Sequence, residues 1–295
     1  MSLLTTILIL IGKIANLTMP IFIFLMVFNA ALIETPQSLL FTAKQNWKYF
    51  VRMIIVNNCF IPALFWLILS VLPMNPSYKL GILLYFFTAG GPFVLSLIDS
   101  SHLKTSLGTS GLIILLMATM LLFPFQLTFI AKGASITLQQ IFIVLLKTAI
   151  IPLIAGLLMK QFLSFLTSTL FPFLKIAQKW TTNIVIYGMM VAYLPTIFEM
   201  VTNGALFALL LGSTFIGISF FIGYLFEIKN ADDTAKFTAA FMAGQRNAGI
   251  ALIVAASNLK DPALLSLVII ISSIGMIELK LFTKWVTRQI NSNAS

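Results

Sequence analysis

The chain has 295 residues, of which 60% are hydrophobic and only 9% are charged, and its formal net charge is +10. A soluble domain carries roughly 25% charged residues, so lipid rather than water must face much of this surface. The cations lie in the gaps between apolar runs and form no basic stripe, which excludes nucleic acid as the partner. We therefore expect a single all-α polytopic membrane domain over 1–295, embedded in the lipid bilayer.

Long apolar runs divide the chain into membrane-sized segments. A helix needs about 20 apolar residues to cross the hydrocarbon core of a bilayer. Residues 2–15 are apolar but interrupted by Lys13, and we interpret them as an interfacial helix or as the start of the first span. The pattern predicts nine spans, approximately over 17–34, 48–72, 78–101, 106–131, 137–163, 171–199, 204–227, 233–257 and 262–288.

The distribution of Lys and Arg predicts an orientation. With nine spans, the 18 Lys and Arg residues divide as 12 on one side, 4 on the other, and 2 within spans, Lys147 and Arg246. The side with the excess includes Lys175 and Lys179. The positive-inside rule then places the N-terminus outside and the C-terminus in the cytoplasm of a cell inner (plasma) membrane.

Two predicted spans carry glycine near their middle. The third contains Phe-Thr-Ala-Gly-Gly-Pro at 87–92, and the eighth contains Phe-Met-Ala-Gly-Gln-Arg-Asn at 241–247. Glycine and proline should unwind both helices, and paired broken helices in corresponding halves indicate the central site of a transporter. The shared Phe-x-Ala-Gly predicts inverted repeats. Close helix packing at Gly-Gly, or a chance match of four residues, is the alternative interpretation.

Several motifs follow one another in a fixed order along the chain. They are Met26-Val27-Phe28 with Pro36, Asn57 five residues before Pro62, Gly90-Gly91, Lys147-Thr148-Ala149-Ile150-Ile151-Pro152, and Gln245-Arg246-Asn247-Ala248-Gly249. In order and spacing, this set resembles the bile acid:sodium symporter family over nearly the whole chain, as a divergent member of bacterial type. The resemblance implies a core domain with two crossed, broken helices, a panel domain, and nine spans with the N-terminus outside.

The candidate substrate-binding residues come from the two interrupted spans and from the second span. They are Thr88, Gly90, Gly91, Pro92, Gln245, Arg246, Asn247 and Asn57. Asn57 is the better cavity candidate of two adjacent amides, and polar contact between helices is the alternative role for it.

The family's sodium positions differ in this chain. According to the resemblance, sodium-coupled members carry Ser-Asn where this chain has Val94-Leu95, a Glu where it has Met242, and a Gln where it has Arg246. Sodium needs oxygen ligands, and these side chains supply none. We therefore expect no cofactor, no metal and no inherited sodium site. The alternative is a sodium-coupled symporter whose ligands are backbone carbonyls and Asn57.

Arg246 is a permanent cation in the middle of a span. A charge there costs roughly 3 kcal/mol on insertion scales, so it requires a partner or a purpose. One hypothesis makes its guanidinium a tethered substitute for sodium that attracts an anionic substrate. A second pairs it with Asp99, two turns beyond Gly91, and a third places it in a loop. Asp99 itself is either a coupling carboxylate or a structural one at a helix end.

The residue patterns favour a transporter over an enzyme. The chain has no His-Glu-x-x-His, no pair of membrane aspartates and no phosphate-binding glycine loop. We predict a secondary transporter that moves a small or amphipathic organic anion by alternating access. A membrane receptor or structural protein is the alternative of another class. The sequence makes no prediction of the oligomeric state.

Overall fold

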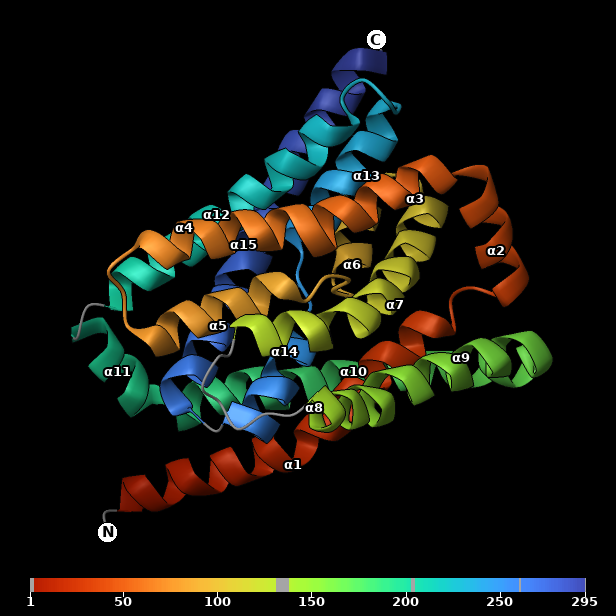
Figure 1. Ribbon diagram of the computed structural model, residues 1–295. Helices are drawn as coiled ribbons and strands as arrows, with labels where there is room; N and C mark the ends of the chain where they lie inside the picture. Colours follow the sequence, from red (N-terminus) through yellow and green to blue (C-terminus); the bar gives the residue numbers. More distant parts are fainter. Residues whose placement is uncertain (1–2, 131–137, 203–204, 260, 295) are drawn as a thin grey trace.

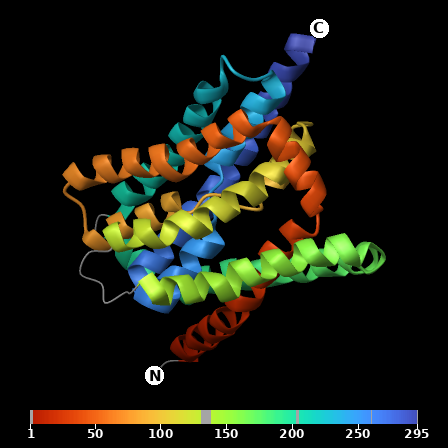
Figure 2. The same cartoon turned by 45° about the vertical axis from the view of Figure 1, so that its right-hand side comes forward.

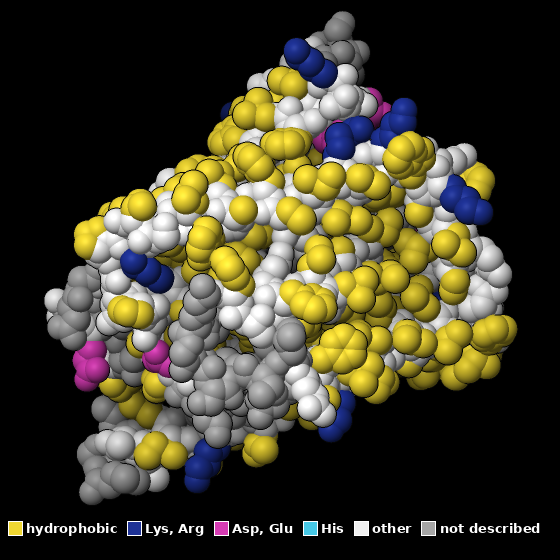
Figure 3. Space-filling model, viewed as in Figure 1, with side chains coloured by type: hydrophobic (Ala, Val, Ile, Leu, Met, Phe, Trp, Pro, Cys, Tyr) yellow, Lys and Arg dark blue, Asp and Glu magenta, His cyan; other side chains and the backbone are white. Residues whose placement is uncertain are grey.

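The computed structural model describes residues 3–130, 138–202, 205–259 and 261–294. In this part of the chain all regular structure is helical and there is no strand, which confirms the all-α class (Figure 1). Among the described residues, six helices are long and apolar enough to cross a membrane. Hydrophobic side chains cover much of the face in Figure 3, while most Lys and Arg lie towards its edges. These features indicate a multi-pass membrane protein.

The described helices overlap the predicted spans but differ from them at several places. Helix α10 ends at Ala192, inside the sixth predicted span, and α15 runs six residues beyond the ninth, to Ala294. Helix α1 begins at Leu3 and runs without interruption to Ala31. From Leu3 onward, the apolar N-terminal stretch is therefore the start of the first predicted span and not a separate interfacial helix. Helix α10 begins at Ser164, seven residues before the predicted span at 171. The elements are α1 (Leu3–Ala31), α2 (Pro36–Gln45), α3 (Trp47–Ile54), η1 (Ile55–Phe60), α4 (Ile61–Val71), α5 (Pro76–Phe87), α6 (Val94–Ser100), α7 (Thr105–Ile130), α8 (Leu138–Leu145), η2 (Leu146–Ile150), α9 (Ile151–Phe162), α10 (Ser164–Ala192), α11 (Leu194–Thr202), α12 (Ala205–Glu227), α13 (Asp233–Gly244), α14 (Ala248–Val254), η3 (Ala255–Leu259) and α15 (Pro262–Ala294).

A proline explains the π-helical segment η1 in the second predicted span. Pro62 has no N–H, so no backbone donor at this position can continue the helical ladder. The N–H of Ile61 bonds the carbonyl of Val56, five residues back, as in a π-helix. The carbonyl of Asn57 is therefore left without a backbone partner, since Ile61 is engaged elsewhere and Pro62 cannot donate. This orphaned carbonyl becomes part of the site described below.

The helices form two groups, which lie on opposite sides of a central space. Helix α1 packs along α10 and α9, and this group, with α8 and η2, is called the flanking bundle. In the second group, helices α12, α13 and α15 pack together, α5 packs on α15, and α3 packs on α7. This group is called the crossing bundle, and it also includes α4, η1, α6, α14 and η3. Figures 1 and 2 show the flanking bundle below the crossing bundle in both views.

Ion pairs gather at one end of the crossing bundle. Arg52 donates to both carboxylate oxygens of Glu227, at 2.7 and 2.6 Å. Lys104 lies 2.6 Å from Asp232, between the loop after α6 and the loop before α13. The hydrogen bond from Lys104 holds the pKa of Asp232 below its ordinary value. The last turn of α3, the end of α12 and these two loops therefore lie at the same end of the molecule.

Candidate functional site

Two glycines shape the interruption between α5 and α6. Gly90 has φ of 78°, in the left-handed region that favours glycine. A Cβ on Gly90 would also lie 2.9 Å from the backbone nitrogen of Leu116. A Cβ on Gly91 would collide with the backbone carbonyl of Arg246, in the other interruption. The Gly90-Gly91 pair therefore sets how closely the two broken helices approach each other.

The two interruptions cross and hydrogen-bond each other. The N–H of Asn247 donates to the carbonyl of Thr88 at 2.8 Å, and the Thr88 hydroxyl donates to the carbonyl of Asn247 at 3.0 Å. The Asn247 amide donates to the carbonyl of Gly90 at 3.0 Å, and its oxygen caps α14 by accepting from Ile250 at 3.1 Å. Backbone groups freed by unwinding are thus satisfied within the protein, as a membrane interior requires.

Thr119 of α7 supports the same crossing, and no sequence pattern singled it out. Its hydroxyl lies 3.2 Å from the N–H of Ala89 and 3.3 Å from the carbonyl of Ala89. The side-chain amide of Asn58 donates to that hydroxyl at 2.8 Å. Asn58 therefore connects the π-helical segment η1 to the crossing through Thr119.

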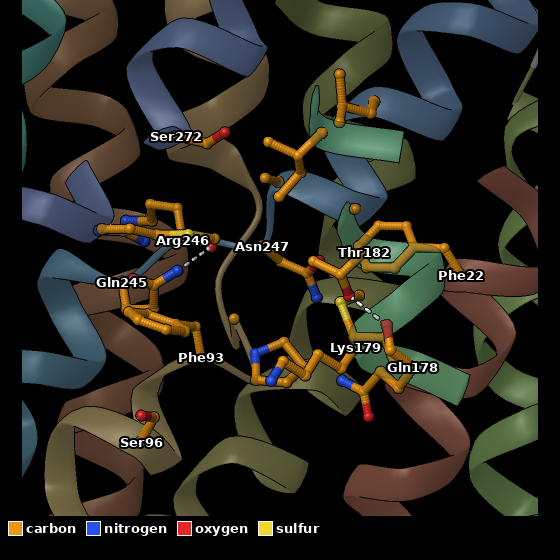
Figure 4. A pocket seen from close by; sticks show the side chains of 18 of the residues that line it. Phe22, Phe93, Ser96, Gln178, Lys179, Thr182, Gln245, Arg246, Asn247 and Ser272 are labelled. Atoms are coloured by element: carbon orange, nitrogen blue, oxygen red, sulfur yellow. Dashed lines mark hydrogen bonds between the residues drawn. The ribbon is translucent and has the colours of Figure 1, made fainter. Parts of the chain in front are cut away.

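The Arg246 side chain points into the crossing bundle. It is fully buried, its Nη1 donates to the orphaned carbonyl of Asn57 at 3.0 Å, and its guanidinium lies 5.8 Å from the ring centre of Phe86. Its Nε and Nη2 have no hydrogen-bond partner. In Figure 4 it runs away from Gln178 and Lys179, which lie across the cavity.

The expected pair between Arg246 and Asp99 is not formed. Asp99 is exposed on α6, whose direction carries it away from the crossing towards a second cavity. Ion pairs in the described part of the chain join Arg52 with Glu227, Lys104 with Asp232 and Lys236 with Asp233. Arg246 is likewise not in a loop outside the bundle, since it is buried at the crossing.

A cavity of 590 Å³ lies between the two bundles. Its wall on the crossing bundle includes five predicted site residues: Gly91, Pro92, Gln245, Arg246 and Asn247. Thr88, Gly90 and Asn57 do not line it. Thr88 and Gly90 bond Asn247, while Asn57, whose side-chain amide donates to the carbonyl of Met53, bonds Arg246. The sequence therefore located the crossing, but only part of its residues faces the cavity.

The opposite wall is a polar stripe on α10 that the sequence analysis missed. It consists of Lys175, Gln178, Lys179, Thr182 and Asn183, at the i, i+3, i+4, i+7, i+8 spacing of one helix face. The count of Lys and Arg on the two sides of the membrane had assigned Lys175 and Lys179 to the cytoplasmic side. The periodicity of polar residues inside an otherwise apolar segment is the signal that could have found them. Figure 4 shows Gln178, Lys179 and Thr182 together on this wall.

A second cavity of 490 Å³ adjoins the first. Both are lined by Met26, Pro92, Ser96, Lys175 and Gln178, and the second is also lined by Asn29 and Asp99. Asn29 of α1 donates to the carbonyl of Leu174 at 3.0 Å and to the side-chain oxygen of Gln178 at 2.8 Å. These bonds fix α1 to α10, so both cavities share a rigid flanking wall.

The residues at the expected sodium positions do not fit sodium. Val94 and Met242 are buried hydrocarbon and thioether side chains, and Leu95 lines the second cavity. The guanidinium of Arg246 is itself a cation. No side chain of this set offers an oxygen ligand.

A scan against protein-family models finds no match to the chain, and a search of the curated proteins finds none either. The geometry of the two bundles and of the cavity between them is therefore the basis for assigning a function.

Proposed function

We propose that the protein is a secondary transporter of an organic anion in an inner (plasma) membrane. The observation that carries this proposal is the 590 Å³ cavity, which lies between two helix bundles and is bounded by two crossing helix interruptions. Secondary transporters place their substrate site beside such interruptions. The apolar side chains of Phe22, Met26 and Ile186 and the ammonium groups of Lys175 and Lys179 line the same cavity, which suits an amphipathic anion.

The resemblance to bile acid:sodium symporters belongs to the same proposal. The crossing bundle would be the core domain of that family and the flanking bundle its panel domain. Nine spans in inverted halves, with the N-terminus outside, complete the proposed topology. The mutual hydrogen bonds of Thr88 and Asn247 support it, because corresponding interruptions in two halves would meet in this way.

Alternating access requires one bundle to move against the other. Each bundle is tied internally: Thr88 and Asn247 bond within the crossing bundle, and Asn29 and Gln178 within the flanking bundle. Thr109 of α7 donates to Glu34 at 2.6 Å, at the connection where the chain leaves α1 for α2. We propose that the crossing moves as a unit and that this connection is a hinge.

Arg246 takes the place of a coupling cation in this proposal. Its guanidinium bonds the Asn57 carbonyl and so holds η1 against the crossing with a charge that never dissociates. Because the side chain is buried away from the cavity, its attraction for an anion acts through the low-dielectric core rather than by contact. Transport would then proceed without sodium.

Sodium coupling through backbone carbonyls and Asn57 is the second candidate, favoured by the side-chain oxygen of Asn57, which is buried and has no hydrogen-bond partner. Thermal stability in NaCl, KCl and choline chloride at equal ionic strength separates the two. A ligand that binds only the folded state raises stability by mass action. We expect equal stability in the three salts, and a sodium-specific rise would contradict the role given to Arg246.

Counterflow in proteoliposomes tests transport itself. Vesicles loaded with unlabelled phenyl sulfate and phenyl phosphate should accumulate labelled anion from outside, because the gradient of unlabelled substrate drives exchange and no gradient of a coupling ion is needed. A receptor or structural protein would show no accumulation. Absence of counterflow for both anions, in protein that is monodisperse and correctly inserted, would contradict the proposed function.

A further inference from the structure

The two cavity lysines lie deep along α10. Lys175 and Lys179 follow the start of the helix at Ser164 by 11 and 15 residues. At 1.5 Å per residue these positions are roughly 16 and 22 Å from that end. The hairpin tip carries Lys160, in the last turn of α9, beside the exposed Phe162 and Phe165, so the cation at this helix end is Lys160. Lys175 and Lys179 are therefore not helix-end residues at the membrane surface.

The lipid-facing side of α10 is distinct from the lysine side. Large apolar residues are exposed at helical spacing along it: Phe173, Ile176, Trp180, Ile184 and Tyr187. A lysine turned towards hydrocarbon costs several kcal/mol, whereas one turned into a polar cavity keeps its hydration. Lys175 and Lys179 line the cavity, one turn apart on the same face. The helix thus delivers two ammonium groups to a single place.

The charges around the two cavities do not cancel. The 590 Å³ cavity is lined by two lysines, Lys175 and Lys179, and by no carboxylate among its described lining residues. Asp99 lines only the second cavity, so the side chains that face the two cavities together keep a surplus of +1. Neither lysine takes part in the ion pairs found in the described part of the chain. Lys175 lies instead over the ring of Phe171, 4.8 Å from its centre. An uncompensated surplus inside a membrane protein marks a site for a ligand of opposite charge.

We propose that the substrate carries a doubly charged head group, of the organic phosphate monoester class, held between Lys175 and Lys179. Its apolar body lies against Phe22, Met26 and Ile186 on the same wall. The inference rests on the proposed function and specifies its substrate class. Two ammonium groups one turn apart match the several oxygens and two charges of a phosphate monoester, which loses its second proton at about pH 6.

Phenyl phosphate and phenyl sulfate provide the test, because they share shape and ring and differ by one charge at pH 8. Binding is measured as the rise in melting temperature of the purified protein with each anion at constant ionic strength. We expect phenyl phosphate to bind at least tenfold more tightly than phenyl sulfate. Lowering the pH to 5 should abolish this difference, because the phosphate ester then carries a single charge.

Four variants locate the head group. Lys175→Gln and Lys179→Gln should each reduce phenyl phosphate affinity about tenfold and leave phenyl sulfate affinity within about threefold, since one ammonium still pairs the single charge. Lys179→Arg should retain the preference because it keeps the charge. Lys284 is an exposed lysine on α15 outside the cavity, so Lys284→Gln is the control and should change neither affinity.

The outcomes separate the inference from the proposed function. Two results would overturn the dianion site and leave anion transport in place. One is equal affinity for the two anions in the unmodified protein. The other is a preference for phenyl phosphate that remains in the double variant Lys175→Gln/Lys179→Gln. No binding and no counterflow with either anion contradicts the proposed function itself. The melting temperature of each variant without anion, compared with that of Lys179→Arg, shows whether a loss of affinity is caused by a loss of folded protein.

Discussion

The two walls of the cavity are built in different ways. The crossing wall is held by backbone groups, with Thr88 and Asn247 bonding each other and Gly91 allowing no side chain. The α10 wall consists of side chains, with Lys175 and Lys179 exposed in the cavity and free of ion pairs in the described part of the chain. Backbone complementarity fixes geometry, while side chains that remain accessible determine what binds. The first wall should therefore tolerate little change and the second should tolerate much.

The largest loss of stability should follow Gly91→Ala. The new Cβ meets the carbonyl of Arg246, which is backbone and cannot rotate away. We expect a loss of about 3 kcal/mol, the upper range for overpacking, measured as the fall in melting temperature in detergent. Gly12→Ala is the control, because its Cβ would meet only the Cβ of Ala192, at 3.2 Å. If both variants melted like the unmodified protein, the crossing would not be the rigid wall.

Arg246→Gln should damage transport more than folding. It removes the donor to the Asn57 carbonyl and the buried charge together, for a loss of about 2 kcal/mol. Counterflow of phenyl sulfate should fall more than tenfold. Arg246→Lys keeps the charge and should retain a measurable rate. Unchanged counterflow in Arg246→Gln would remove Arg246 from the mechanism.

Asn29→Ala sharpens the comparison from the other side, since it weakens the flanking wall. Its amide bonds Leu174 and Gln178, and removing both bonds should cost about 1 kcal/mol in melting stability. Phenyl phosphate binding should weaken by less than about threefold, because the lysines remain. A larger loss of affinity would show that the position of α10, rather than its charges, controls binding.

The smallest effect concerns the exposed pair of Lys104 and Asp232, remote from both walls. The pKa of Asp232 is lowered in the folded protein, so its contribution is present above the unfolded value of about 4 and disappears as the pH falls through the folded value. Both side chains are more than half exposed, so this contribution is below about 0.5 kcal/mol. Lys104→Gln should therefore lower the melting temperature slightly at pH 7 and not at pH 3.

The helical segments and the position of the crossing could be predicted from the sequence, because hydropathy and glycine act locally. Gly90 and Gly91 mark an interruption whatever surrounds them. The partner of Arg246 could not be predicted, because it is the Asn57 carbonyl, freed by Pro62. Asp99 was wrong as that partner, since the direction of α6 after the interruption depends on packing.

The lysines of α10 were missed for a different reason. Counting charges treats Lys175 and Lys179 as markers of a membrane boundary, although α10 already begins at Ser164. The spacing of these lysines with Gln178 and Thr182 places all four residues on one helical face, and a count of charges takes no account of such spacing. A polar periodicity inside a long apolar segment should therefore be considered before its lysines are placed in a loop.

Relative movement of the two bundles is tested most directly by locking them together. Gly249 of α14 contacts Met26 of α1, since a Cβ on Gly249 would lie 2.7 Å from the methionine methyl group, and both residues line the cavity. The chain has one cysteine, Cys59, which is replaced by serine in the test protein. Met26→Cys with Gly249→Cys in this background places one thiol on each bundle, and a short bifunctional thiol reagent with a cleavable disulfide should join them. We predict that this cross-link abolishes phenyl phosphate counterflow and that a thiol reductant restores it, while the same treatment does not change the counterflow of either single-cysteine variant. Full counterflow in the cross-linked protein would contradict transport by movement of one bundle against the other.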